Sequence, residues 1–330
     1  MINSQSQTGA AVPAGAGTAG DTVAGTQPEL ASPAPRGRAA VVSGLVRTAR
    51  PKQWIKNVLV LAAPGAAGAL TRPHLLLLTL GAVGIFCAVA SGTYFVNDTL
   101  DAAADRRHPT KRHRPVAAGI VPVPLAWATG LGLMAAGLVS SWALAGTHLT
   151  MVVGAYVAVT LAYSAWLKHE AILDLAAVAA GFVLRAIAGG VAAGVVLSDW
   201  FLIVASFGSL FMVAGKRYAE HQELGDERGD HRVTLAAYSL SFLRYVRSLS
   251  SAVAIAAYCL WAFEKAAVAG QGAIWFELSI VPFVIAVLRY ALLLEAGKGS
   301  APEEVVLGDR QLIIVGLVWA AVFALGVYGL

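Results

Sequence analysis

The sequence predicts an all-α, polytopic membrane protein in which nine transmembrane helices are bundled around a cavity that opens at the cytoplasmic face. Hydrophobic residues make up 58% of the 330 residues and charged residues only 13%, about half the charged share of a soluble domain. Apolar runs of about 18 to 25 residues recur, long enough to cross a bilayer as helices. Eight Trp and nine Tyr, several near the ends of these runs, fit the aromatic belts of membrane proteins. With only two Cys, the composition excludes a water-soluble domain, a disulfide-stapled secreted fold and a nucleic-acid-binding module.

The chain is expected to divide into a tail and a single domain. Residues 1–44 are mostly small residues and Pro, which bury too little apolar surface to offset the entropy of ordering, so this tail is predicted to be disordered. Residues 45–330 are predicted to form one transmembrane catalytic domain, rich in the Gly and Ala that let membrane helices pack closely. Its nine apolar segments are Val58–Leu70, Leu75–Val96, Ala126–Ala145, Leu149–Trp166, Ile172–Leu197, Trp200–Ala214, Ser248–Phe263, Ile274–Leu294 and Leu312–Leu330.

Positive charge is distributed unevenly between the two sides of the expected bundle. With a cytoplasmic N-terminus and nine crossings, 21 of the 24 Lys and Arg residues fall toward the cytoplasmic side, when Arg289 near the cytoplasmic end of the eighth segment is counted there. Only Arg72 and Lys265 fall on the opposite side, and Arg185 lies inside a segment. Because Lys and Arg concentrate on the cytoplasmic side of membrane proteins, we expect a plasma-membrane protein whose N-terminus and active-site mouth face the cytoplasm.

An acidic motif ends the second apolar segment. Asn97, Asp98, Asp101 and Asp105 fall on one stripe of a helix, because residues three, four and seven apart share a face. No Lys or Arg lies between the three carboxylates, so a cation must compensate their repulsion. Oxygen ligands on one stripe suit Mg²⁺ or Mn²⁺, which predicts a metal site. The alternative is a solvated helix end that carries spare charge.

A basic run follows the acidic motif directly, at residues 106–115. Lys111, Arg112 and Arg114 lie in this run. Acidic residues followed by basic ones can hold a metal-bridged polyphosphate, because carboxylates bind the metal while Arg and Lys bind the free oxygens. A purely topological role for the positive charges is the alternative.

A second polar cluster follows the sixth segment and contains Lys216, Arg217, Tyr218 and Glu220. A plain ion pair between Lys216 and Glu220, four residues apart on a helix, is one explanation. The cluster is nevertheless expected at the same cytoplasmic depth as the acidic motif, so we interpret it as a second wall of one site.

Two weaker features point to the same site. Arg185 lies in the middle of Ile172–Leu197, and a mid-membrane Arg is costly unless it faces a polar cavity or a partner. Lys52, Lys56 and Asn57 lead into the first segment and are expected near the same mouth. Snorkelling of the two lysines to the membrane interface explains them equally well.

These motifs together resemble those of the UbiA superfamily of intramembrane prenyltransferases. The acidic motif at residues 97–105 alone is similar to the superfamily. Three stretches are similar to its decaprenyl-phosphate phosphoribosyltransferase branch: R-P-K-Q-W-I-K-N at 50–57, H-P-T-K-R-H-R-P-V-A-A-G at 108–119 and F-M-V-A-G-K-R-Y-A-E at 211–220. The chain departs from the superfamily pattern at Lys216–Glu220, where a second aspartate motif is usual.

The resemblance implies transfer of 5-phosphoribose from phosphoribosyl diphosphate to a polyprenyl phosphate, releasing diphosphate, for cell-wall arabinan synthesis. Asp98, Asp101 and Asp105, with Asn97, would hold Mg²⁺ against the diphosphate as the bond to ribose breaks. The remaining candidates would bind substrate phosphates or ribose: Lys52, Lys56, Asn57, Lys111, Arg112, Arg114, Arg185, Lys216, Arg217, Tyr218 and Glu220. Whether copies of the chain form a homo-oligomer is left open by the sequence.

Two other functions compete with this interpretation. A superfamily member that joins a prenyl diphosphate to an aromatic acceptor would share the fold and the metal. A transporter with a basic cytoplasmic vestibule would need ionisable residues at several mid-membrane positions or paired broken helices, whereas only Arg185 is clearly mid-membrane.

Overall fold

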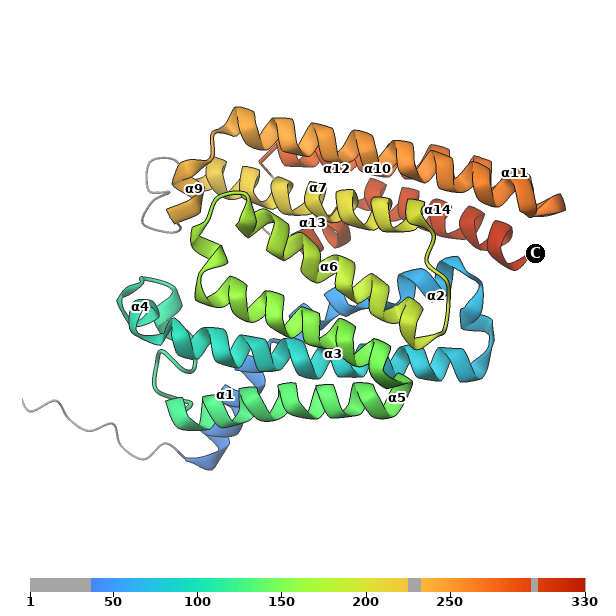
Figure 1. Ribbon diagram of the computed structural model, residues 1–330. Helices are drawn as coiled ribbons and strands as arrows, with labels where there is room; N and C mark the ends of the chain where they lie inside the picture. The colour runs from blue at the N-terminus through green and yellow to red at the C-terminus, as the bar shows by residue number, and fades with distance from the viewer. Residues whose placement is uncertain (1–36, 225–232, 298–301, 330) are drawn as a thin grey trace, which may run out of the picture. The chain divides into compact units, whose positions relative to one another are not determined.

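The computed structural model describes residues 37–224, 233–297 and 302–329. Within these ranges every regular element is a helix (Figure 1). The longer helices are α1 (Arg38–Ala49), η1 (Pro51–Leu61), α3 (Pro73–Leu100), α5 (Val123–Ala165), α6 (Leu173–Ala192), α7 (Asp199–Leu224), α10 (Leu240–Val268), α12 (Ile280–Glu295) and α14 (Arg310–Tyr328). Shorter ones are α2 (Ala62–Ala66), η2 (Ala69–Thr71), α4 (Ala102–Arg107), η3 (Lys111–His113), η4 (Leu167–His169), α9 (Val233–Ala237), η6 (Gly270–Gly272), α11 (Ala273–Leu278) and α13 (Pro302–Gly308).

Seven helical stretches of the described chain are long and apolar enough to cross a membrane. They are α3, α5, α6, α7, α10, the combined stretch Ala273–Glu295 and α14. Helix α5 has 43 residues and leaves helical geometry at Ala145 and Gly146, so it contains two of the expected segments. The first expected segment, Val58–Leu70, is built of η1, α2 and η2 rather than one regular α-helix. The fold is therefore the expected all-α bundle, and the count of nine crossings stays a prediction.

The first described helix corrects the predicted boundary between tail and domain. Helix α1 begins at Arg38, seven residues before the expected start at residue 45. Residues 38–44 were assigned to the tail because they contain few large apolar residues. They are held in place because Gly44 packs against the loop before α5, where an added Cβ would lie 2.8 Å from Val121 and 2.9 Å from Ile120. Residues 1–36, the rest of the predicted tail, lie outside the described residues.

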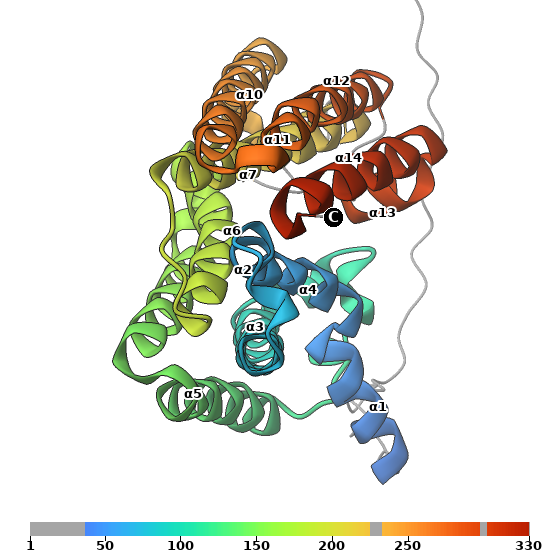
Figure 2. The same cartoon turned by 90° about the vertical axis from the view of Figure 1, so that its right-hand side faces the viewer.

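Small residues bring the helix backbones together. Helices α3 and α5 run side by side (Figures 1 and 2), and a Cβ on Gly137 would lie 2.1 Å from Val89 of α3. The approach of α6 to η1 is closer still, because a Cβ on Gly189 would lie 1.7 Å from the carbonyl oxygen of Val60. Only glycine fits these two positions, as expected where membrane helices pack without a hydrophobic driving force.

Helices α4 and α9 lie at the same end of the bundle (Figure 1). We call this end, with η4 between them, the charged end, because it carries the ion pair of Lys168 and Asp101. The C-terminus of α3 and the N-terminus of α6 meet there through contacts of η4. Lys168 of η4 binds Asp101 after α3, and Thr234 of α9 donates to the Lys168 carbonyl. The acidic motif and the second polar cluster thus lie at the same end, as the sequence predicted.

Candidate active site

The acidic motif lies where α3 ends and α4 begins. Asp98 is 2% exposed and Asp105 is also buried, while Asp101 caps the C-terminus of α3 and is partly exposed. Nη1 of Arg114 lies 3.3 Å from Oδ1 of Asp98 and 2.8 Å from Oδ2 of Asp105. These two carboxylates therefore converge on a single cationic atom. Asn97 donates instead to Asp101, at 3.3 Å.

The compensating cations come from other parts of the chain. Arg50 donates to Oδ1 of Asp98 at 2.5 Å, and Nζ of Lys168 lies 2.6 Å from Oδ1 of Asp101. All three cations, Arg50, Arg114 and Lys168, have partly exposed side chains. Of these pairs, only that of Lys168 with Asp101 is partly exposed on both sides, and an ion pair of that kind stabilises a fold by little. Arg50 and Arg114 reach solvent, whereas their partners Asp98 and Asp105 are buried.

The backbone at Arg50 is shaped to deliver its side chain to Asp98. Arg50 has φ of 52° between α1 and η1, a left-handed conformation that is uncommon outside glycine. The residue that follows, Pro51, starts η1. The guanidinium also lies over the ring of Tyr94, 4.6 Å from its centroid, which adds a cation–π contact to the ion pair.

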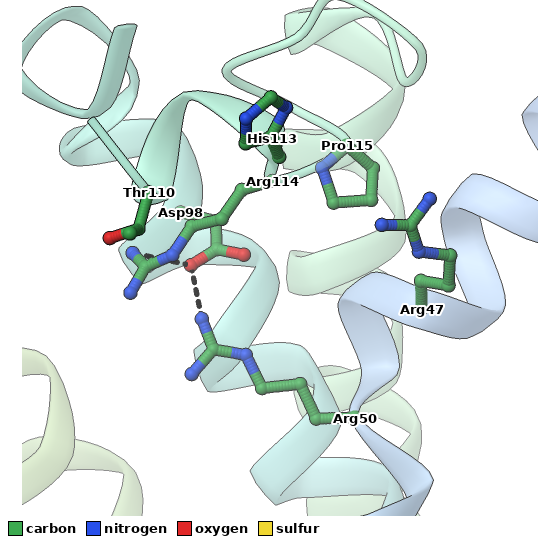
Figure 3. Close-up of a pocket in the computed structure, with 7 residues that line it drawn as sticks. All are labelled: Arg47, Arg50, Asp98, Thr110, His113, Arg114 and Pro115. Atoms are coloured by element: carbon green, nitrogen blue, oxygen red, sulfur yellow. Dashed lines mark hydrogen bonds and ion pairs between the residues drawn. The ribbon is translucent and has the colours of Figure 1, made fainter. Parts of the chain in front are cut away.

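A pocket of about 300 Å³ opens between α1, the end of α3 and the basic run (Figure 3). Figure 3 shows the guanidinium groups of Arg50 and Arg114 both directed at Asp98, whereas that of Arg47 lies apart from them. The lining residues are Arg47, Arg50, Asp98, Thr110, His113, Arg114 and Pro115. The lining thus carries three guanidinium groups and one carboxylate, which makes the pocket attractive to anions.

The chemistry of the acidic motif fits a hard divalent cation. Carboxylate and amide oxygens are the ligands that Mg²⁺ prefers, and Asp98 and Asp105 already share one positive atom. In the ranges that the structure describes, no three His, Cys, Asp or Glu side chains are grouped to hold a metal ion. Asp101 would have to exchange Lys168 for the metal to complete such a group.

The second polar cluster is a closed network. Arg217 of α7 is 3% exposed and donates to Asp174 at 3.0 Å and to Glu220 at 2.9 Å. Asp174, at 0% exposed, also accepts a hydrogen bond from the hydroxyl of Tyr238. Burial and this bond raise the pKa of Tyr238. Lys216 lies 3.8 Å from Glu220. The network joins α6, α7 and the segment before α10.

Tyr218 belongs to a different network from its neighbour Arg217. Its hydroxyl donates to Glu295 of α12 at 2.9 Å, and the guanidinium of Arg247 lies 4.5 Å from the centroid of its ring. Arg247 in turn pairs with Glu295. Tyr218 is buried and ties the end of α7 to α10 and α12.

Arg185 is buried deep in α6 with neutral partners. It donates to Oδ1 of Asn57 at 2.8 Å, to the Gly181 carbonyl at 2.6 Å and to the Tyr156 hydroxyl at 2.8 Å. Each of its terminal nitrogens thus has an acceptor, and Asn57 is brought together with it. Arg185 therefore links η1, α5 and α6, although no carboxylate of the described chain neutralises its charge.

The remaining predicted residues lie at the edge of the charged end. Lys52 and Arg112 are exposed, and Lys56 and Lys111 are half-buried. The sequence interpretation missed Lys168, Asp174 and Arg50. Both residues carried a signal, because Lys168 lies in the short connection between two apolar segments and Asp174 is an acidic residue near the start of the second. Arg50 is the first residue of the stretch 50–57, which resembles the family, but the sequence did not predict that it binds the acidic motif.

The site places buried aspartates and several cations at one end of an apolar helical bundle. The chain belongs to the UbiA prenyltransferase family, whose model matches residues 58–308, and it is a multi-pass membrane protein. Two similar curated proteins are named decaprenyl-phosphate phosphoribosyltransferase. That of Corynebacterium glutamicum is 44% identical over 87% of this chain and 88% of its own length. That of Mycolicibacterium smegmatis is 45% identical over 87% of this chain and 93% of its own length. The family and branch predicted from the motifs are confirmed.

Solved structures share the fold. A UbiA homolog from Archaeoglobus fulgidus bound to GPP and Mg²⁺ superposes with a TM-score of 0.65 at 16% identity, over 86% of this chain and 99% of that one. A structure of digeranylgeranylglyceryl phosphate synthase superposes with a TM-score of 0.62 at 16% identity, over 88% of this chain and 99% of that one. At this identity the likeness establishes the architecture and no more.

Proposed function

We propose that this chain is a phosphoribosyltransferase that moves 5-phosphoribose from phosphoribosyl diphosphate to decaprenyl phosphate and releases diphosphate. One observation carries the proposal: relatives of that name match 86–87% of the chain at 44–45% identity, over 88–94% of their own length. The charge of the site supports it, because a donor with a diphosphate and a 5-phosphate, meeting an acceptor phosphate, needs many cationic groups. Arg47, Arg50, Arg114 and Lys168 supply them around the three aspartates.

Asp98 and Asp105 are the residues best placed to hold Mg²⁺, since their carboxylates converge. Asp101 would become a third metal ligand once its ion pair with Lys168 is broken, and Asn97 would join through its hydrogen bond to Asp101. Mn²⁺ would suit the same oxygen ligands. When bound, the ion supplies positive charge to the diphosphate leaving group. Arg114 and Lys168, released from the carboxylates, are then free to bind phosphate oxygens.

In the proposed reaction the bond between ribose C1 and the diphosphate oxygen breaks, and its electron pair leaves with diphosphate. An oxygen of the acceptor phosphate forms the new bond to C1 from the opposite face. A phosphate monoester has a second pKa of about 6 and is mostly a dianion near neutral pH. No proton therefore has to move, and the site needs no general base.

The proposed orientation places the charged end in the cytoplasm at the plasma membrane. Positively charged residues concentrate at this end, as on the cytoplasmic side of membrane proteins. Phosphoribosyl diphosphate is water-soluble, whereas the acceptor is a lipid, so the reaction belongs at this boundary.

The test is transfer of label by the purified full chain in detergent with Mg²⁺. With labelled phosphoribosyl diphosphate and decaprenyl phosphate, label should move into the organic phase, and a chelator should stop the transfer. A parallel reaction with labelled geranyl diphosphate and 4-hydroxybenzoate tests for prenyl transfer. Label in the organic phase of the second reaction alone would contradict the proposal.

A further inference from the structure

The pocket beside the acidic motif is lined by a cation, Arg47, whose side chain has no partner among the residues that the structure describes. The guanidinium of Arg47 lines the pocket and forms no hydrogen bond or ion pair with any residue in the described ranges. Arg50 and Arg114, by contrast, are both paired with Asp98. An unpaired guanidinium facing a cavity suits an anionic ligand, since such groups bind phosphate oxygens with two parallel hydrogen bonds.

The charges of the pocket match a phosphate monoester. Its lining carries three guanidinium groups and one carboxylate, and Thr110 and His113 add further hydrogen-bonding groups. A phosphate monoester carries about −1.5 to −2 charges at pH 7. Its arrival would balance the surplus positive charge of the lining.

Helix α1, which supplies Arg47, has the properties of a helix that lies in the membrane interface. It runs across the direction of the long helices (Figure 1) and directly precedes the first apolar segment at η1. Val42 and Val46 are 59% and 55% exposed, one turn apart on the same face. Exposed apolar residues beside Arg are compatible with a helix at headgroup depth that turns its apolar side toward the acyl chains.

Gly44 holds α1 against the basic run. A Cβ at Gly44 would lie 2.8 Å from Val121 and 3.5 Å from Pro115, so the helix backbone rests on the residues that follow Arg114. The pocket is consequently walled on one side by an interfacial helix and on the other by the acidic motif. A phosphate bound there stands at the level of lipid headgroups.

From these observations we propose that the pocket receives the phosphate of the lipid acceptor, with Arg47 as its principal ligand and His113 and Thr110 beside it. The inference rests on the proposed function and assigns the acceptor phosphate to α1. The donor diphosphate remains at the acidic motif. Arg47 is then a substrate-binding residue that sets the affinity for polyprenyl phosphate.

The experiment compares Arg47→Gln with Arg38→Gln in the purified full chain. Arg38 begins the same helix and does not line the pocket, so its change controls for loss of positive charge on α1. For Arg47→Gln we expect KM for decaprenyl phosphate to rise about tenfold, the loss of one charge-assisted contact. KM for phosphoribosyl diphosphate should stay within about twofold, whereas Arg38→Gln should change neither. A thermal melt checks that both variants fold.

Arg47→Lys provides a second measurement, since lysine keeps the positive charge but lacks the two parallel N–H donors of the guanidinium group. It should give a KM for the lipid between those of the wild type and Arg47→Gln. If Arg47→Gln instead raised KM for phosphoribosyl diphosphate alone, the pocket would belong to the donor 5-phosphate and the inference would be overturned. Behaviour identical to Arg38→Gln would also overturn it. Failure of the wild-type chain to label the lipid would contradict the proposed function instead.

Discussion

The two charged clusters of the molecule look alike in sequence and differ in structure. The cluster around the acidic motif is held by Arg50, Arg114 and Lys168, whose side chains are partly open to solvent. The cluster around Arg217 and Asp174 is almost completely buried. The carboxylates Asp98 and Asp105 are themselves buried, so the difference between the clusters lies in the cations. An ion pair whose cation reaches solvent is weaker than a pair buried on both sides, and a pair buried on both sides is costly to break from one side. The first cluster is thus built to exchange partners, and the second to hold helices together.

The largest expected effect is a loss of folding stability when the buried cluster around Arg217 and Asp174 is disrupted. Asp174→Ala leaves the buried Arg217 without its most buried partner, and losing one side of a buried pair costs about 3–5 kcal/mol. Thermal unfolding of the variant in detergent should show a strongly lowered midpoint or no folded protein. Glu220→Gln is the matched control, because Glu220 is partly exposed and should cost much less. Equal stability of the two variants would contradict the distinction.

The second effect appears in activity rather than in stability. Asp101→Ala should lower kcat by about 10²–10³-fold, the typical cost of removing one group that stabilises transition-state charge. Its folding should be nearly unchanged, because the lost pair with Lys168 is partly exposed. Near-normal turnover of this variant with Mg²⁺ present would refute the metal role of the motif.

A third, smaller effect depends on pH. The pKa of Tyr238 is raised by burial and by the bond to Asp174, so the protonated hydroxyl is the form that the fold favours. Its contribution is complete below the ordinary tyrosine value of about 10 and is lost as the pH rises toward the raised value. Tyr238→Phe should cost about 1–2 kcal/mol at neutral pH.

Thermal unfolding of the wild type and of Tyr238→Phe, measured from neutral pH to above pH 10, tests the direction of this pH dependence. The gap between wild type and Tyr238→Phe should narrow above pH 10, because only the wild type loses the hydroxyl proton. A gap that widened with pH would show that the bond to Asp174 does not favour the protonated form.

The smallest effect concerns the competition at Asp101. Lys168→Gln should change the free energy of unfolding by less than about 1 kcal/mol. It should also lower the Mg²⁺ concentration that gives half-maximal activity, about twofold, because the ammonium group no longer competes for the carboxylate. Arg112→Gln, at an exposed position of the basic run, serves as the charge-matched control. A higher Mg²⁺ requirement in Lys168→Gln alone would contradict the competition.

The membrane helices were predictable because their signal is local hydrophobicity. Leu75–Val96 and Leu312–Leu330 correspond closely to α3 and α14. The extra turns of α10 before Ser248 were missed, since Leu240–Arg247 includes two Arg and carries no continuous apolar pattern. Helix α1 was missed for the opposite reason, because its order depends on packing of Gly44 against a distant loop.

Site residues were predictable in type but not in pairing. The acidic motif and the basic run follow each other in sequence, so their meeting could be expected. Partners such as Lys168 for Asp101, 67 residues apart, depend on how α5 and α6 return to the charged end. The burial of Arg217 and Tyr218 likewise depends on α10 and α12, so their predicted contact with substrate stays a prediction.

The contact between Gly189 and the Val60 carbonyl indicates where the helices of the bundle are held most closely together. Since no Cβ fits between Gly189 and the Val60 carbonyl, η1 and α6 are in backbone contact there, and Arg185 donates to Asn57 across the same contact. Helix α5, by contrast, leaves helical geometry at Ala145 and Gly146. If the bundle opens to a long ligand, we expect it to open along α5 rather than between η1 and α6.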